Sequence, residues 1–365
     1  MTGTMLMSGT IPMSGTMTGM MQTPGVSEEA AAAPPASGVQ GSVWTANEAG
    51  DSISVIDAGT NQVLTTLTGI PGPHNLQAAP DGKSVWAVSG HGAAAVMIDT
   101  ASFDVHGVVP TGKAPAHIVL TPDGKTAYAS NSGDNTVTAI DTATMQPVAT
   151  IPVGQYPHGL RPSPNGKWIY VANMEGNTLS VIDTKSNTKI ADIAVGQRPV
   201  QVGFSPDGKS VYVSLNAENA VGKVDVASRR LVDKVQIGVG PVQVYVTPDG
   251  KTLLVANQGT KENPSTTVSI IDTNTFKVVD TVETGQGAHG VVIEPSGRYA
   301  YITNLYGDNM AVLDIGARKV VATVPTGAGP NGVSFLPGSV IAAPATQIEL
   351  ALPPMGQEMD MDHAG

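Results

Sequence analysis

TPDGKTAYASNSGDNTVTAIDTATMQPVATIPVGQYPHG, which spans Thr121 to Gly159, returns with variations along most of residues 41–339. The aspartate of its IDT motif recurs at Asp57, Asp99, Asp141, Asp183, Asp225, Asp272 and Asp314. The proline of its PDGK motif keeps the same phase at Pro80, Pro122, Pro164, Pro206, Pro248, Pro295 and Pro337. Successive aspartates are 42 positions apart, except for one interval of 47 that contains five extra residues. Seven landmarks in phase indicate an array of seven equivalent structural units.

Each unit contains four short β-rich runs separated by turn signals. In PDGK the proline fixes φ, the aspartate bonds its own backbone, and the glycine accepts a positive φ. Four strands of this length per repeat are typical of one propeller blade. One position in the second run is large in every copy: Trp44, Trp86, Tyr128, Tyr170, Tyr212, Leu254 and Tyr301. We interpret this column as core between blades rather than as an aromatic binding platform.

The two ends of the array predict how the ring closes. The last copy retains only its first strand, GVSFLP at residues 332–337, and the first copy begins at its second strand, SVWTAN at residues 42–47. Pairing the two completes a seventh blade and leaves no open sheet edge at that place. The sequence therefore predicts an all-β fold, a closed seven-bladed β-propeller of four-stranded blades, over residues 41–341.

The repeats also carry a family resemblance. The strands YITN (residues 301–304), YVAN (170–173) and LVAN (254–257), with the SVIDT and SPDGK phrases, resemble the YVTN-family β-propeller repeat over about 300 of the 365 residues. The resemblance implies a periplasmic, secreted or surface-layer protein that is a non-enzymatic binding or scaffold module. Related seven-bladed rings hold the copper cluster of nitrous oxide reductase and the heme d1 of cytochrome cd1, so the fold alone does not decide activity.

Residues 1–40 and 342–365 differ from the ring. The first segment is a tail rich in Met, Gly and Thr, followed by an Ala/Pro linker, and the last ends in a Met/Asp/His run. We expect both tails to be disordered, with one short strand at residues 348–352. Residues 1–22 lack the pattern of a signal peptide, and we favour a removed leader over a cytoplasmic chain. Thioethers are soft ligands for Cu(I), so these tail residues are candidate copper ligands: Met5, Met7, Met355, Met359, Met361 and His363. The plain alternative is low-complexity sequence.

A second candidate site comes from the loops that lead into each first strand, which meet at the mouth of the central channel. His74, His158 and His289 occupy equivalent positions, and His117 is offset by one residue. With His91, in a loop on the same face, these side chains are candidate ligands for a borderline transition metal. Four further polar residues lie at the same level of the channel: Asn75, Gln201, Gln243 and Asn331. They predict a mouth that binds a ligand, and they also fit the alternative of a mouth that is only polar and hydrated. Arg161 lies lower in a first strand, where it could hold a small anion.

The amino-acid composition disfavours or excludes several classes of function. The net charge of −11 disfavours nucleic acid and anionic membranes, and the absence of cysteine excludes disulfides and thiolate sites. No apolar run reaches eighteen residues, and no hydrolase, metalloprotease or dinucleotide motif is present. The leading prediction is a binding propeller that presents its loop face to a protein, a cell-surface polymer or a small ligand. The alternatives are a copper-handling protein, and an enzyme that is either a metal-dependent oxidoreductase or lactonase-like. The sequence establishes no cofactor, and copper is the candidate.

Overall fold

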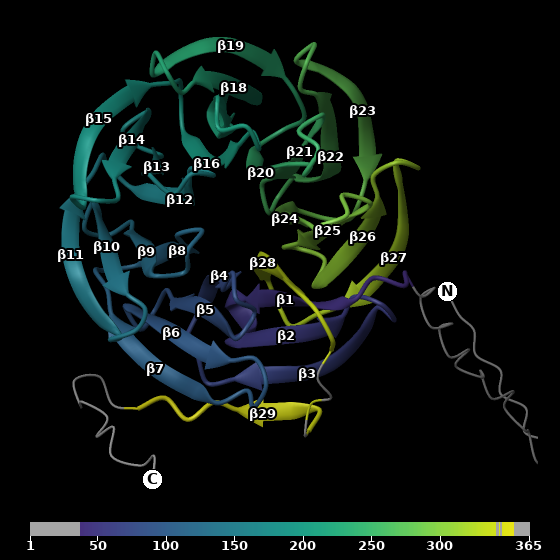
Figure 1. Ribbon diagram of the computed structural model, residues 1–365. Coiled ribbons are helices and arrows are strands. Elements are labelled where there is room, and N and C mark those ends of the chain that lie inside the picture. The colour runs from purple at the N-terminus through teal and green to yellow at the C-terminus, as the bar shows by residue number, and fades with distance from the viewer. Residues whose placement is uncertain (1–36, 341–342, 344, 354–365) are drawn as a thin grey trace, which may run out of the picture. The chain divides into compact units, whose positions relative to one another are not determined.

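The computed structural model describes residues 37–340, 343 and 345–353, all within the compact unit Pro34–Gly365. In this part of the chain, seven antiparallel sheets stand around a central channel, and the elements other than strands are two short 3-10 turns, η1 (Glu48–Gly50) and η2 (Asn216–Glu218) (Figure 1). The predicted closed seven-bladed propeller is confirmed. None of the helices described is long and apolar enough to cross a membrane.

The strands follow the repeat, four to a blade. The first sheet contains β28 (Pro330–Pro337), β1 (Gly41–Asn47), β2 (Ser52–Asp57), β3 (Gln62–Thr68) and β29 (Gln347–Glu349). The next three contain β4 (Pro73–Ala78), β5 (Ser84–Ser89), β6 (Ala94–Asp99) and β7 (Val105–Pro110); β8 (Pro115–Leu120), β9 (Thr126–Asn131), β10 (Thr136–Asp141) and β11 (Gln146–Pro152); and β12 (Pro157–Pro162), β13 (Trp168–Asn173), β14 (Thr178–Asp183) and β15 (Thr188–Ala194). The last three contain β16 (Pro199–Phe204), β17 (Ser210–Leu215), β18 (Ala220–Asp225) and β19 (Arg230–Gln236); β20 (Pro241–Val246), β21 (Thr252–Gly259), β22 (Pro264–Asp272) and β23 (Lys277–Glu283); and β24 (Ala288–Ile293), β25 (Tyr299–Asn304), β26 (Asn309–Asp314) and β27 (Lys319–Pro325).

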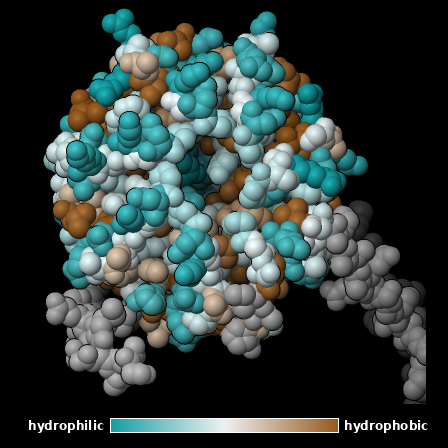
Figure 2. Space-filling model, viewed as in Figure 1, coloured by the Kyte–Doolittle hydropathy of each residue, from teal (hydrophilic) through white to brown (hydrophobic). Residues whose placement is uncertain are grey.

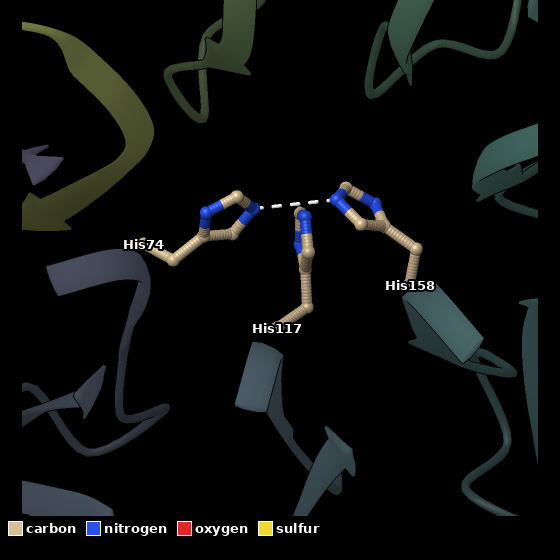
Figure 3. Close-up of side chains that lie close together, drawn as sticks. All are labelled: His74, His117 and His158. Carbon is tan, nitrogen blue, oxygen red and sulfur yellow. Dashed lines mark hydrogen bonds between the residues drawn. The ribbon is translucent and has the colours of Figure 1, made fainter. Parts of the chain in front are cut away.

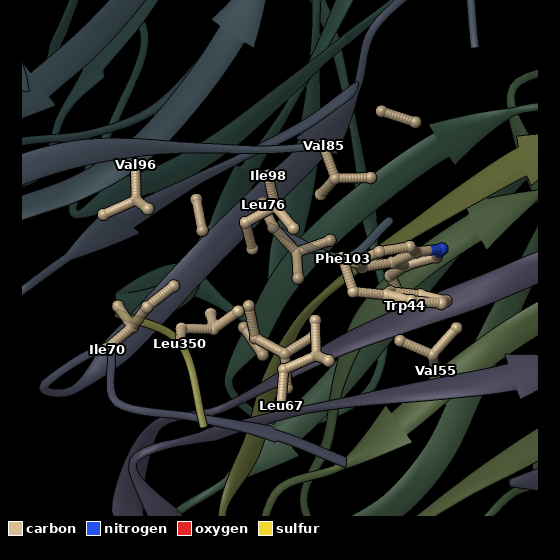
Figure 4. Close-up of a cluster of buried hydrophobic side chains, with 14 residues drawn as sticks. Trp44, Val55, Leu67, Ile70, Leu76, Val85, Val96, Ile98, Phe103 and Leu350 are labelled. Atoms are coloured by element: carbon tan, nitrogen blue, oxygen red, sulfur yellow. The ribbon is translucent and has the colours of Figure 1, made fainter. Parts of the chain in front are cut away.

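Only the first sheet joins distant parts of the chain. Its inner strand β28 pairs antiparallel with β1, and Trp44 lies opposite Ser334. On the outer edge, β29 pairs in parallel with β3 and so covers an edge that would otherwise be open. The strand expected at residues 348–352 is shorter, Gln347–Glu349. It ends there because Leu350 turns inward and packs with Leu67 and Ile70 (Figure 4).

The aromatic column is core between blades, as interpreted from the sequence. Every member is at most 2% exposed. Several of the rings meet a phenylalanine: Trp44 stacks on Phe103 of the next blade with ring centroids 5.9 Å apart, and Tyr170 meets Phe204 edge-on at 5.2 Å. Large rings that bridge neighbouring sheets bury apolar surface, which holds the blades in a ring.

The repeated aspartates close turns. Asp183 is typical, because its Oδ1 accepts hydrogen bonds from the backbone N–H groups of Lys185 and Ser186 at 3.1 and 2.9 Å. Four of the PDGK-type turns use a second device, in which a Ser or Thr before the proline and the Asp or Asn after it bond each other, as Thr121 and Asp123 do at 2.7 Å. Repetition of these carboxylates thus reflects turn chemistry rather than catalysis.

The predicted tail ligands Met5, Met7, Met355, Met359, Met361 and His363 lie outside the described residues. Their assignment to copper stays a prediction.

Candidate metal centre at the channel mouth

The seven inner strands, β4, β8, β12, β16, β20, β24 and β28, surround the channel, which opens at the centre of the ring amid hydrophilic side chains (Figure 2). In β4, β8 and β12 the pairing with the second strand skips from the leading proline to the fourth residue. The two residues between them leave the hydrogen-bonded ladder in a bulge, which frees their side chains to turn into the channel. His74, His117 and His158 all stand in these bulges.

The structure brings these three histidines together. Their ligand nitrogens all lie within 4.8 Å of one another, and the Nε2 atoms of His74 and His158 are 3.3 Å apart. Figure 3 shows the His117 ring standing between the other two, with all three rings converging from neighbouring inner strands. The offset of His117 by one residue therefore does not remove it from the group.

The outward-facing nitrogen of His74 is held by a carboxylate that the sequence analysis missed. His74 Nδ1 lies 3.1 Å from Glu48 Oε2, and that oxygen also accepts a hydrogen bond from Asn331 Nδ2 at 2.8 Å. Burial alone would raise the pKa of Glu48, but the hydrogen bonds from His74 and Asn331 outweigh it and lower the pKa to about 2. Asn331 Nδ2 also lies 3.1 Å from His74 Nδ1, so this nitrogen has both a donor and an acceptor beside it. We assign the His74 proton to Nδ1, because an ionised carboxylate only accepts hydrogen bonds, and this assignment leaves the Nε2 lone pair facing the channel.

A signal for Glu48 was present in the repeat. The position after the last residue of the repeated second-strand motif holds Glu48, Gly90, Ser132, Met174, Asn216, Gln258 and Leu305 in the seven copies, and Glu48 is the one carboxylate. Gln258 has the same relation to His289 that Glu48 has to His74, since its Oε1 lies 3.2 Å from His289 Nδ1. Comparing this column with the histidine column of the following blade links Glu48 to His74 and Gln258 to His289.

The other two histidines also have partners for Nδ1. His158 Nδ1 lies 3.3 Å from the carbonyl oxygen of Val200, which again leaves Nε2 as the free nitrogen. His117 Nδ1 lies 3.3 Å from Gln201 Nε2, while Gln201 Oε1 accepts the N–H of Val202 at 2.8 Å. His117 is fully buried, and its Nε2 has no hydrogen-bond partner within the described part of the chain.

A serine fixes the spacing of two of the strands. Ser130 Oγ, on β9, accepts the backbone N–H of His117 at 3.1 Å and donates to the carbonyl oxygen of His158. Ser214 makes the same bridge between Gln201 and Val242 two blades on. The bridge is thus a feature of the repeat that here sets the separation of two histidines.

Burial keeps these imidazoles neutral. Desolvation, followed by repulsion from neighbouring histidines, lowers the pKa of His158 to about 3 and the pKa of His117 well below its usual value. Desolvation likewise lowers the pKa of His289 to about 3. The neutral imidazole is the form that binds a metal ion, so His117 and His158 need lose no net proton at neutral pH.

The remaining predicted residues lie elsewhere or have structural partners. His289 is buried on β24 and His91 is exposed in a turn beside Gly72, and neither belongs to the three-histidine group. Asn75 Oδ1 accepts the N–H of Ile118 at 3.3 Å, and Gln243 Oε1 accepts that of Val291 at 3.2 Å. These amides join neighbouring inner strands through hydrogen bonds to the backbone. Arg161 stands near the far end of β12.

Comparison with known proteins places the fold. A sequence profile described as YNCE-like beta-propeller matches residues 92–335. Hydrazine synthase of Kuenenia stuttgartiensis is 26% identical, over 75% of this chain and 97% of that one, with a TM-score of 0.66. A functionally unknown protein from Desulfotomaculum acetoxidans is 20% identical over 81% and 99% of the two chains, with a TM-score of 0.72. Dihydro-heme d1 dehydrogenase NirN is 14% identical over 80% and 74%, with a TM-score of 0.60. A search of curated proteins gave no match.

Proposed function

The chain belongs to the YNCE-like β-propeller family, and we propose that it is a binding propeller that holds one transition-metal ion at its channel mouth through His74, His117 and His158. One observation carries the proposal, the 3.3 Å separation of His74 Nε2 and His158 Nε2. Two nitrogens at about 2.0 Å from one ion, at a tetrahedral angle, lie about 3.3 Å apart. His117, whose ligand nitrogen lies within 4.8 Å of the other two, would move inward slightly to serve as third ligand and would leave a fourth position for water or another ligand.

The chemistry of the three imidazole ligands limits which metal ions can bind. Neutral imidazole suits Cu(II), Zn(II), Ni(II) and Fe(II), and hard ions such as Mg²⁺ prefer oxygen. Among divalent ions Cu(II) forms the most stable complexes with a given set of nitrogen ligands, whereas tetrahedral spacing matches Zn(II). We therefore expect both ions to bind and Cu(II) to bind more tightly.

The plain alternative is a hydrogen bond between His74 and His158 that shares one proton. Two observations favour a metal ion over that alternative. His117 Nε2 is buried and unpartnered within the described residues, which costs about 1–3 kcal/mol, and an ion bound there after the ring proton moves to Nδ1 would remove that cost. Glu48 and the Val200 carbonyl also accept from Nδ1 of the two other rings, which directs both Nε2 lone pairs to one point.

The test is a titration of chelator-treated full-length protein with Cu(II) and, separately, with Zn(II). We expect one tight site per chain that is lost in the variant with His74, His117 and His158 changed to Ala. The His91→Ala variant, altered on the same face but outside the group, should keep it. The proposal fails if the parent takes up neither ion, or if the triple variant, folded by circular dichroism, keeps the parent's affinity for both.

Location and partners belong to the same proposal. Resemblance to YVTN-type repeats supports a place outside the cytoplasm, where a metal-binding propeller could offer its loop face to a protein or a polymer. Detection of the protein only in the cytosolic fraction of its cells would contradict this location. The activities named for hydrazine synthase and NirN belong to those proteins, and an enzyme remains an alternative to the binding propeller.

A further inference from the structure

A second polar group lies in the channel at the opposite end from the histidines. A cavity of about 260 Å³ is lined there by residues near the ends of five inner strands, among them Gln77, Leu120, Arg161, Gly203 and Tyr245. His158 and Arg161 are both on β12, and the bulge between Pro157 and Leu160 changes the alternation so that both side chains face the channel. Three residues of strand separate the two levels by about 10 Å.

Arg161 is an unpaired charge in this cavity. It makes no ion pair or hydrogen bond with the described residues, and its guanidinium carbon lies 5.9 Å from the centre of the Tyr245 ring. The side chain is half-buried, and burial lowers the pKa of Arg161. A guanidinium remains protonated in proteins, so the cavity contains a fixed, partly desolvated positive charge. Such a charge is costly unless something neutralises it.

Space for a ligand comes from one missing side chain. Positions 77, 119, 161, 203 and 245 are equivalent in successive repeats and hold Gln77, Val119, Arg161, Gly203 and Tyr245. Gly203 is on the blade between those that carry Arg161 and Tyr245, and it lines the cavity without a side chain, with Val244 close on one side of it. A cavity of ~150 Å³ is enough to hold a benzene ring, so the volume here accommodates a ring with a substituent.

We infer that this end of the channel binds a small monocarboxylate with an apolar body, the carboxylate on Arg161 and the body in the space left by Gly203. The guanidinium fork matches a carboxylate in two parallel hydrogen bonds. The rest of the lining includes Leu120, Phe204, Val244 and Val246, together with the Tyr245 ring, which suits hydrocarbon. Arg161 is the one charged residue among those lining the cavity, so a single negative charge is matched and a multiply charged phosphate is not.

The test uses chelator-treated full-length protein, so its result does not depend on the metal centre. Benzoate is titrated by calorimetry beside benzamide, its neutral counterpart, and inorganic phosphate. We expect one benzoate per chain, with binding at least about tenfold weaker for benzamide and for phosphate. In R161Q benzoate binding should fall at least about tenfold, and in R198Q, which alters an exposed arginine, it should not change.

Gly203→Val gives an independent check that leaves the charge in place. A Cβ at position 203 would lie 3.3 Å from Val244 Cγ2 and from the Val244 carbonyl oxygen, so this neighbour must shift by a few tenths of an ångström. In a Gly203→Val protein that is folded by circular dichroism, the valine should narrow the cavity and weaken benzoate binding at least about tenfold. The inference is overturned if the parent does not bind benzoate, if R161Q or Gly203→Val binds it as the parent does, or if phosphate binds more tightly.

Discussion

The Nε2 atoms of His74 and His158 lie 3.3 Å apart although the two residues are 84 positions apart in the chain, which is two full repeats. They therefore stand at equivalent places on alternate blades, and the blade between them supplies His117. A repeat that only had to build a ring would need no histidine at these places, because other blades have Val200 and Val242 there. The variants below test what holds the three rings in this arrangement.

Glu48→Gln should weaken metal binding about tenfold without changing the number of sites. The carboxylate orients His74 and increases its basicity, and loss of such a partner commonly costs 10–100-fold in affinity. Competition titration with a chromophoric chelator measures the change. Glu218→Gln is the matched control, since Glu218 belongs to the other 3-10 turn and bonds Lys234 instead. Equal affinities for parent and Glu48→Gln would show that Glu48 does not support the ligand.

Gln201→Glu should strengthen metal binding about tenfold. As placed, the Gln201 amide donates to His117 Nδ1 and so sets the proton on Nε2, the nitrogen that must bind the ion. A carboxylate would accept from both His117 Nδ1 and the N–H of Val202, and would free Nε2. The same titration measures this gain, with Gln243→Glu as control in the next blade. A weaker site in Gln201→Glu would refute this account of the tautomer.

Ser130→Ala and Ser214→Ala should have similar effects on stability and different effects on the metal. Each removes one bridge between neighbouring blades, so each should lower the free energy of unfolding by about 1 kcal/mol. Only Ser130 spaces two histidines, so only Ser130→Ala should lower metal affinity, by several-fold. Urea unfolding and metal titration of both variants provide the comparison. Similar losses of affinity in the two would mean that the effect is general loosening of the ring.

Glu294→Thr should destabilise the sixth PDGK-type turn by about 2 kcal/mol, because Glu294 Oε1 accepts the N–H groups of Arg298 and Tyr299 at 2.8 and 3.1 Å. Three other blades place Ser or Thr here and the carboxylate two residues later, as in Thr121 and Asp123, whereas this blade has Ser296 in the later place. The double variant Glu294→Thr, Ser296→Asp should therefore regain most of the stability. Chemical denaturation that shows no recovery would reject this exchange of roles.

Tyr128→Phe should make the protein less sensitive to alkali. Burial raises the pKa of Tyr128 from 10.0 to about 12, and its hydroxyl donates to Asn187 Oδ1 at 2.6 Å. The unfolded chain loses this proton near pH 10 and the folded one near pH 12, so the stabilisation is complete below pH 10 and is lost as the pH rises to 12. Between pH 8 and pH 11 the free energy of unfolding should fall by about 1.4 kcal/mol less in the variant. In the control variant Tyr156→Phe, which alters an exposed ring, the free energy of unfolding should fall as much as it does in the parent.

Sequence alone predicts this fold well because seven in-phase copies repeat the same turn chemistry, and the incomplete copies at the two ends indicate how the ring closes. The site was predicted less completely. Equivalence in the repeat identified His74 and His158, but how close two alternate blades bring their side chains depends on the bulges after the leading prolines, which carry no sequence signature. Glu48 and Ser130 were missed because each acts on a histidine of a neighbouring strand rather than of its own.

The pairing of β28 with β1 has a consequence for how the protein is made. Asn331 and Glu48, which both contact His74 Nδ1, are 283 positions apart, and the ribosome synthesises Glu48 long before Asn331. Blades built from consecutive strands can form during synthesis. The first blade lacks β28 until synthesis is nearly complete, so the edge of β1 stays unpaired and can pair wrongly with other nascent chains. A circular permutant that starts between β27 and β28 would supply the inner strand first, and it should fold faster and aggregate less.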